Sequence, residues 1–244
     1  MKPTQRKLPK LASDQVHLWL ADFQDWQLDI DDLRNLLSEA ELQRLERYLI
    51  PIKQEQFTIS RGLLRLLLAS YLQEGPADIQ LKTNEDGKPY LVGHPIHFNI
   101  SHSGKYLLLG FTLLDQIGVD IQEIYPISNL DTLLKRYFHD QESTYLEALA
   151  PHHRIGSFFA IWTAKEAYLK ASGVGFTKSS RSVGLLPSGD PTRSFHFAES
   201  PTSGKKPYWT IQGLDLPDSY RGAVAVSAPL EGILQRSLKP TDFQ

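Results

Sequence analysis

The chain has 244 residues, of which 41% are hydrophobic, enough to bury the core of one large domain or two small ones. Its net charge of −2 gives no overall attraction to nucleic acid, and without cysteine it has no disulfide, thiolate nucleophile or zinc–thiolate site. With no apolar run near about eighteen residues and no signal-peptide core, we expect a soluble cytoplasmic protein without membrane or nucleic-acid partners.

The first elements are a strand and a capped helix. Residues 16–23 alternate between apolar and polar side chains, as a half-buried strand does. Ser38 and Glu41 have the spacing of a capping box, which predicts a helix that runs on to the proline at position 51. Arg44 lies on this helix.

The longest helical signal of the first half covers residues 54–73, where leucines recur at helical spacing before a Gly-Pro stop. Arg61 and Arg65 lie about one turn apart on it. Such a pair is often an ordinary solvated helix face, so alone it identifies no site.

Polar side chains accompany the strand-like runs that follow. After a short run at 79–82, the turn NEDGKPYL displays Lys88. The runs HFNIS (97–101) and YLLLGF (106–111) are joined by a small polar turn, and Ser101 and His102 lie where the first of them ends.

The run GVDIQEI, at 118–124, predicts a further strand. Alternation places Val119 and Ile121 on one face and Asp120 and Gln122 on the other. Two polar side chains therefore point together toward whatever covers that face.

The second half continues with helices and then short strands. Residues 129–138 and 141–149 predict short helices, with Asp140 as a cap, and Gly173 predicts the end of a longer helix. Further strands are expected at 182–186, 195–198, 209–214 and 221–227.

Each half thus predicts helices packed against a few strands. Although the letters show no exact repeat, this similar content predicts an α+β fold of two pseudo-duplicated lobes. We expect an N-terminal lobe at 1–116, a C-terminal lobe at 117–244, and the active site in the cleft between them.

The longer helix contains FFAIWTAKEAYLKASGVGF, in which Glu166 and Lys170 lie four residues apart and share one face. Apolar residues can bury most of the remaining surface, so this pair must either face a cleft or form an ion pair. The helix alone leaves both interpretations open.

The polar residues combine into a possible phosphate and metal site. Asp120 and Glu166 are hard oxygen ligands of the kind that Mg²⁺ takes, although two distant acids alone indicate little. Ammonium, guanidinium, imidazole and hydroxyl groups bind phosphate, and the candidates of these types are Lys88, Ser101, His102, Lys170, Arg44, Arg61 and Arg65.

Two catalytic alternatives use the same residues. A serine hydrolase is disfavoured because the Ser101-His102 run lies between two strands, whereas a nucleophile elbow lies between a strand and a helix. A metal-dependent nuclease or phosphohydrolase remains a competitor, although such enzymes place the acid and the lysine one residue apart on a strand.

Four ordered blocks give a specific resemblance. They are GKPYL at 87–91, FNISHSG at 98–104, GVDIQ at 118–122 and WTAKEAYLKASGVG at 162–175. The region that contains them, 87–175, is about a third of the chain. The blocks resemble the successive motifs of the 4′-phosphopantetheinyl transferases, in particular the long two-lobed type that activates surfactin-synthetase-like peptide synthetases. The resemblance implies transfer of phosphopantetheine from coenzyme A to a carrier-protein serine, with release of 3′,5′-ADP.

The resemblance also implies roles for the site residues. Asp120 and Glu166 match metal-binding acids, and Lys170 matches the lysine beside the coenzyme A pyrophosphate. Lys88, Ser101 and His102 match positions that hold the nucleotide end, as does Arg44 on a weaker block. We expect Glu166 to act also as the general base, with Lys170 stabilising the charge that develops on the leaving phosphate.

Gln122 departs from the family pattern, because relatives of the surfactin type commonly have a second acid there. An amide oxygen is a neutral and weaker ligand, so we expect a two-carboxylate Mg²⁺ site completed by water or Gln122. A degenerate, non-catalytic coenzyme A or nucleotide-binding module is a second alternative.

The implied partners are coenzyme A and an apo acyl or peptidyl carrier protein, bound by a monomer. Acyl and peptidyl carriers dock by an acidic helix in this family. Its expected complements here are Lys165, Lys178 and Arg181, together with apolar residues near Phe176.

Overall fold

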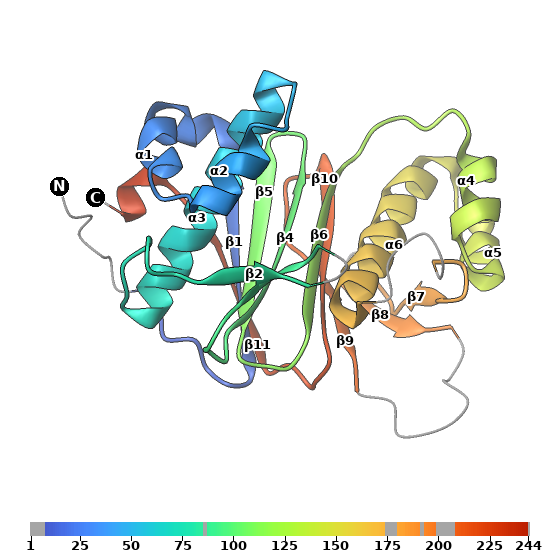
Figure 1. Cartoon of the computed structure of the whole chain (residues 1–244). Coiled ribbons are helices and arrows are strands. Elements are labelled where there is room, and N and C mark those ends of the chain that lie inside the picture. The colour runs from blue at the N-terminus through green and yellow to red at the C-terminus, as the bar shows by residue number, and fades with distance from the viewer. Residues whose placement is uncertain (1–7, 85–86, 174–179, 191–192, 199–207, 244) are drawn as a thin grey trace.

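The computed structural model describes residues 8–84, 87–173, 180–190, 193–198 and 208–243 (Figure 1). Among its helices, none combines the length and apolar character needed to cross a membrane. Two larger sheets each carry a long helix, and a two-stranded sheet lies beside the first. The predicted α+β fold of two lobes is confirmed.

The first lobe is built on a sheet in which β5 lies between β1 and β4 and pairs antiparallel with both. Its strands are β1 (Gln15–Asp22), β4 (His97–Ser103) and β5 (Tyr106–Thr112). Around them lie η1 (Phe23–Asp29), α1 (Ile30–Arg34), α2 (Glu39–Leu45), α3 (Pro51–Leu72) and the hairpin of β2 (Leu81–Thr83) with β3 (Pro89–Leu91).

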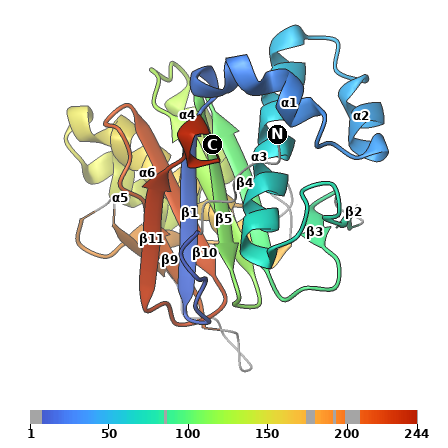
Figure 2. The same ribbon diagram turned by 90° about the vertical axis from the view of Figure 1, so that its left-hand side faces the viewer.

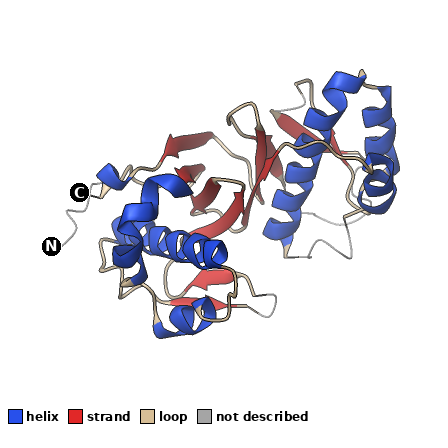
Figure 3. Ribbon diagram, turned by 90° about the horizontal axis from the view of Figure 1, so that it is seen from above, coloured by secondary structure: helices blue, strands red, loops and turns tan. Residues whose placement is uncertain are grey.

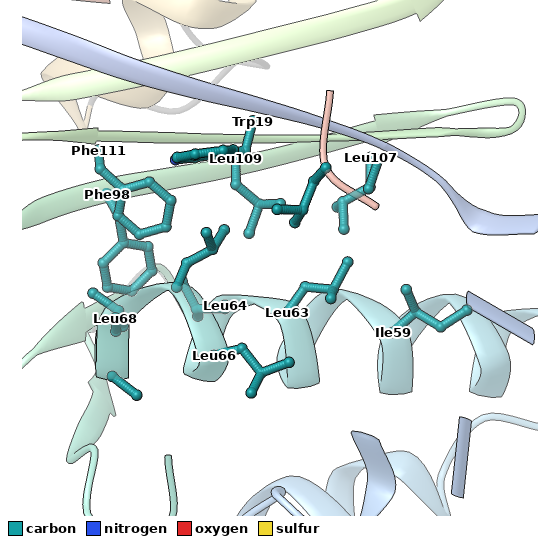
Figure 4. Close-up of a cluster of buried hydrophobic side chains, with 14 of the residues drawn as sticks. Trp19, Ile59, Leu63, Leu64, Leu66, Leu68, Phe98, Leu107, Leu109 and Phe111 are labelled. Carbon is teal, nitrogen blue, oxygen red and sulfur yellow. The ribbon is translucent and has the colours of Figure 1, made fainter. Parts of the chain in front are cut away.

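Helix α3 supplies the main apolar face of this lobe. It begins at Pro51, earlier than predicted, because the first turn of a helix has no partner for the N–H that proline lacks. Leu63 and Leu64 are fully buried and face Trp19 and Phe111 of the sheet (Figure 4).

The helix before it is shorter than predicted. Ser38 Oγ accepts from the Glu41 N–H and the Glu41 carboxylate accepts from the Ser38 N–H, so the predicted capping box starts α2. The helix ends at Leu45, and the chain turns before α3. The strand predicted at 79–82 is also shifted, because β2 begins at Leu81.

The second lobe is a five-stranded sheet covered by helix α6. The strand order is β6-β10-β9-β8-β7. Its elements are β6 (Ile117–Glu123), α4 (Leu130–Tyr137), α5 (Asp140–Ala148), α6 (Pro151–Ser172), β7 (Leu185–Pro187), β8 (Ser194–Phe197), β9 (Thr210–Gly213) and β10 (Tyr220–Val226).

The end of α6 was predicted correctly, whereas the cap of α5 was not. Gly173 ends α6 with a φ of 71°, the left-handed conformation that favours glycine, as predicted. Asp140 is not the cap of α5, because His139 holds that position and its ring Nδ1 accepts from the Gln141 N–H.

The last strand was not predicted and returns to the first lobe. Strand β11 (Gly232–Ser237) pairs parallel with β1 at the edge of the first sheet, as Figure 2 shows. Leu238 and Phe243 of the segment that follows, which includes η2 (Pro240–Asp242), then pack on the first core. The assignment of all residues from 117 to 244 to the second lobe is therefore corrected for this segment, while the boundary near 116 stays a prediction.

A third apolar cluster joins the lobes. It combines Val16, Leu18 and Leu108 of the first sheet with Val119 and Ile121 of β6. The view from above places the two sheets between the helices of the two lobes (Figure 3). Strand β6 therefore lies where the lobes meet.

Candidate functional site

Strand β6 presents Asp120 toward helix α6. Val119 and Ile121 are buried in the cluster between the lobes, which confirms the predicted alternation. Asp120 points to the opposite side, where its carboxylate meets Lys170 of α6. This face is close to the helix because Gly118 has no side chain to separate the two backbones.

Lys170 forms an ion pair, but its partner is Asp120 and not Glu166. Its Nζ lies 2.6 Å from Asp120 Oδ1, 3.1 Å from Ser101 Oγ and 3.3 Å from the Val119 carbonyl oxygen. Ser101 Oγ is also 2.8 Å from Asp120 Oδ1. The structure thus brings three of the predicted site residues together around one carboxylate.

Glu166 has no hydrogen bond or ion pair with another residue in the described part of the chain. Burial, and then the charge of Asp120, raises the pKa of its carboxyl to about 7, although Lys170 opposes this shift. Glu166 lies one turn before Lys170 on α6, close enough for the charge of Asp120 to act on it. A divalent cation placed between them would relieve their repulsion, so this pair fits Mg²⁺.

Gln122 follows Asp120 by two residues on β6, and its place in the metal shell stays a prediction. Within the described part of the chain, its side-chain amide donates only to the Glu123 carbonyl oxygen, at 3.5 Å. Among the residues described, no group of three or more His, Asp or Glu side chains could hold a metal. Asp120 and Glu166 are therefore the acidic ligands that the described site offers, and a two-carboxylate metal site stays a prediction.

Lys88 and His102 both lie close enough to Lys170 for its charge to act on them. Lys88 Nζ donates to the Lys170 carbonyl oxygen at 2.7 Å and to that of Ile117 at 3.2 Å, and burial and then Lys170 lower its pKa. Lys88 is thus held at the end of α6 and is not displayed freely on its turn. Burial, followed by Lys53 and Lys170, lowers the pKa of His102.

A cavity of about 740 Å³ adjoins the β2–β3 hairpin and holds the predicted arginines. Arg44 and Arg61 line it, and their guanidinium groups lie 5.8 and 5.4 Å from the centre of the Phe57 ring. Arg47 and Lys82 line it as well and were not predicted, although Arg47 lies one helical turn beyond Arg44.

Arg65 has no part in this cavity, which corrects its place among the phosphate-binding candidates. It is buried, and its Nε donates to Glu41 at 2.7 Å. Its Nη1 donates to the carbonyl oxygens of Pro76 and Ile79, both at 3.0 Å. Arg65 therefore joins α3 to α2 and to the segment that leads into β2.

Lys165 is likewise excluded from a docking surface. It is 1% exposed, and its Nζ lies 2.6 Å from Glu142 Oε2 and from the Val183 carbonyl oxygen. Arg181 is exposed and pairs with Asp140 at 2.8 Å. Lys178 and Phe176 lie outside the described residues.

Comparisons with known proteins agree on one family over most of the chain. Residues 18–112 match the family model "4′-phosphopantetheinyl transferase, N-terminal", and residues 116–225 match "4′-phosphopantetheinyl transferase superfamily". Phosphopantetheinyl transferase HetI of Nostoc sp. is 34% identical over 225 residues, which cover 89% of this chain and 90% of that protein.

Two further relatives carry the same description. A putative 4′-phosphopantetheinyl transferase of Synechocystis sp. is 36% identical and covers 74% of this chain and 73% of its own length. The 4′-phosphopantetheinyl transferase Sfp of Bacillus subtilis is 30% identical and covers 58% of this chain and 67% of its own length. These matches support neither the nuclease nor the non-catalytic alternative.

Proposed function

This chain belongs to the 4′-phosphopantetheinyl transferase superfamily, and we propose how its own residues move phosphopantetheine from coenzyme A to a carrier-protein serine. The observation that carries the proposal is the geometry around Asp120. The Asp120 carboxylate is held by Ser101 and Lys170, and Glu166 lies one helical turn before Lys170 on α6.

The arginine-lined cavity is the proposed place of the nucleotide end of coenzyme A. Arg44, Arg47 and Arg61 supply guanidinium groups, which bind phosphate with paired donors. The aromatic ring of Phe57 lies close to the guanidinium groups of both Arg44 and Arg61. The 3′-phosphate, which distinguishes coenzyme A from its dephospho form, is the group that these arginines suit.

The pyrophosphate is assigned to the cations near Asp120. Lys170 and His102 can each provide a positive donor, and the Ser101 hydroxyl, which donates to Asp120 in this structure, could instead donate to the pyrophosphate. Because burial and neighbouring lysines lower the pKa of His102, an anion bound there would favour its protonated form. Lys88 supports this region by holding the end of α6.

Asp120 and Glu166 would hold Mg²⁺, with Gln122 or water as further ligands. When bound, the cation would neutralise charge on the pyrophosphate. In this structure Lys170 balances the negative charge of the Asp120 carboxylate. With another cation balancing that charge, Lys170 could turn toward the pyrophosphate.

In the proposed reaction, Glu166 takes the proton of the carrier serine, directly or through a water. The serine oxygen then forms a bond to the β-phosphorus as the bond from that phosphorus to the bridging oxygen breaks, and 3′,5′-ADP leaves. Lys170 stabilises the charge that develops on the departing phosphate. A monomeric state and a cytoplasmic location remain predictions.

A mass measurement tests this proposal. With coenzyme A, Mg²⁺ and an apo carrier protein, the wild type should add about 340 Da to the carrier, the phosphopantetheine increment. Asp120→Asn and Glu166→Gln should each slow the transfer by about a hundredfold or more, because both remove a metal ligand. Glu147→Gln, a change at an exposed carboxylate of α5, is the matched control. Wild-type rates in both site variants would refute the assignment.

A further inference from the structure

Among the strands that the structure describes, none pairs with one edge of β6. Its other edge pairs with β10, and the strand beside the unpaired edge, β4, belongs to the other sheet. We call the backbone groups of Ile117, Val119, Ile121 and Glu123 on that side the free edge of β6. Buried backbone N–H and C=O groups without hydrogen bonds cost free energy of folding, so we expect other groups to bond them in place of a strand.

Side chains of β4 supply partners for the N–H groups of the free edge. Val119 N–H donates to Asn99 Oδ1 at 2.9 Å, and Glu123 N–H donates to Ser103 Oγ at 3.0 Å. Between them, Ile121 N–H lies 3.4 Å from Ser101 Oγ. The three residues of β4 alternate along the strand, so all three side chains point the same way.

Lysines supply partners for the carbonyl groups of the same edge. Ile117 accepts from Lys88 at 3.2 Å, and Val119 accepts from Lys170 at 3.3 Å. Asn99 is buried, with 8% of its surface exposed. The free edge is therefore bonded by a small set of side chains, which take the place of a neighbouring strand: Asn99, Ser101, Ser103 and Lys88 come from the first lobe, and Lys170 comes from α6.

This arrangement fixes Asp120 in the site. Asp120 lies between Val119 and Ile121, whose N–H groups are both held by β4. Ser101 bonds Ile121 and the Asp120 carboxylate with one hydroxyl, so a displacement of β6 along β4 would also displace the carboxylate.

We propose that Asn99 and Ser103 are positioning residues, which set the register of β6 against β4 and so hold Asp120 for metal and phosphate binding. Both act through the backbone of β6, at Val119 and Glu123. The proposal rests on the proposed function of the Asp120 site. It adds to the ligand-binding role of the first lobe a second role, the alignment of β6, the strand that contains Asp120.

Asn99→Leu and Asn99→Asp test the first contact. Leucine keeps the approximate size but removes the acceptor, whereas aspartate keeps an oxygen in its place. Relative to wild type, Asn99→Leu should lower kcat and raise the Mg²⁺ concentration for half-maximal transfer by about tenfold, as loss of a supporting contact does. The KM for the carrier should stay unchanged, and Asn99→Asp should recover most of the loss.

Ser103→Ala and Ser103→Thr test the second contact in the same way, with threonine retaining the hydroxyl. Ser70→Ala is the matched control, because Ser70 is a buried first-lobe serine whose hydroxyl bonds the Leu66 carbonyl oxygen within α3. It should leave the Mg²⁺ dependence as in wild type.

Amide hydrogen exchange provides a readout that needs no activity. In the folded protein, Asn99→Leu should speed the exchange of the Val119 amide, and Ser103→Ala that of the Glu123 amide, while the core of α3 stays protected. If wild-type protein transferred no phosphopantetheine, the proposed function would fail, and exchange would still test the contacts. Unchanged exchange at Val119, or an Asn99→Leu variant with wild-type Mg²⁺ dependence, would overturn the positioning role.

Discussion

Glu166 is the residue whose ionisation should control metal binding. Its pKa of about 7 lies above the usual carboxyl value because of burial and Asp120, so the folded protein binds this proton more tightly than the unfolded chain. The contribution of Glu166 to the free energy of unfolding is therefore full below the usual carboxyl pKa, near pH 4.5, and is lost as the pH rises through about 7.

Binding of Mg²⁺ requires the ionised carboxylate and should release this proton. We therefore expect Mg²⁺ affinity to rise by up to tenfold per unit between about pH 6 and about pH 7, and to level off above that. Calorimetric titrations across this range measure it. Glu166→Gln should bind more weakly and lose the pH dependence, whereas a steep dependence that persisted in this variant would point to another group.

Arg44 and Arg61 should act on the 3′-phosphate of coenzyme A. Replacing either by alanine removes a charged donor, so the KM for coenzyme A should rise by about tenfold or more. Kinetics with dephospho-coenzyme A provide the critical comparison, because without the 3′-phosphate the variants and the wild type should differ little. Arg193→Ala, at an exposed arginine that does not line the cavity, is the control.

The sequence predicts a set of site residues but does not separate them from similar neighbours. Lys165 and Lys170 lie on one helix, yet only the second reaches the site, because the first meets Glu142, which is 23 positions earlier in the chain. Arg61 and Arg65 also lie on one helix, but Arg61 lines the cavity whereas Arg65 pairs with Glu41. Motif order grouped Asp120, Ser101 and Lys170 in one predicted site, and the structure places their side chains in contact. Which other cations reach that site depends on tertiary partners that no local sequence pattern contains.

At the scale of elements, the contact between β6 and α6 depends on Gly118. A Cβ built there would overlap the Ala167 carbonyl oxygen and lie 2.6 Å from the Ala171 nitrogen, and neither backbone atom can move freely. We expect Gly118→Ala to lower the free energy of unfolding by about 3 kcal/mol, which urea denaturation would measure.

Gly232→Ala is a suitable control, because nothing lies within 4 Å of the added carbon. Its effect should stay within about 0.5 kcal/mol. An equally small effect at Gly118 would show that β6 and α6 can separate without cost, contrary to the close packing described above.

Elements with strong local patterns were predicted well, and those without them were not. The hairpin of β4 and β5 and the long helices follow from alternation, periodicity and caps. Strand β11 has no buried face of its own and pairs with β1 more than two hundred residues earlier, so local sequence contains little trace of it. The end of α2 at Leu45 was also missed, because the apolar pattern continues past it and predicts a longer helix.

At the scale of the whole molecule, acid stability should depend on His17. This buried residue of β1 has Nδ1 2.8 Å from the Tyr71 hydroxyl, which also accepts from Trp19 Nε1. Burial, and then Arg236 of β11, lowers the pKa of His17 to about 4. Its stabilising contribution is therefore full above the usual pKa of 6.5 and is lost as the pH falls toward about 4.

We expect the free energy of unfolding to fall by up to about 1.4 kcal/mol per pH unit in this window from His17 alone. Urea denaturation at several pH values would measure the slope. His17→Gln should reduce it, while His152→Gln, at an exposed position, should not. A slope that was the same in all three proteins would assign the acid sensitivity to other groups.

The path of the last strand changes how the two lobes are related. Because β11 completes the first sheet after the chain has built the second, the second lobe is an insertion between β5 and β11 of the first. Two chain crossings, at 113–116 and 227–231, then join the lobes at the same end. A fragment cut near residue 116 would leave the β1 edge bare, so the two halves are not separable modules, and both ends of the described chain lie on the host lobe.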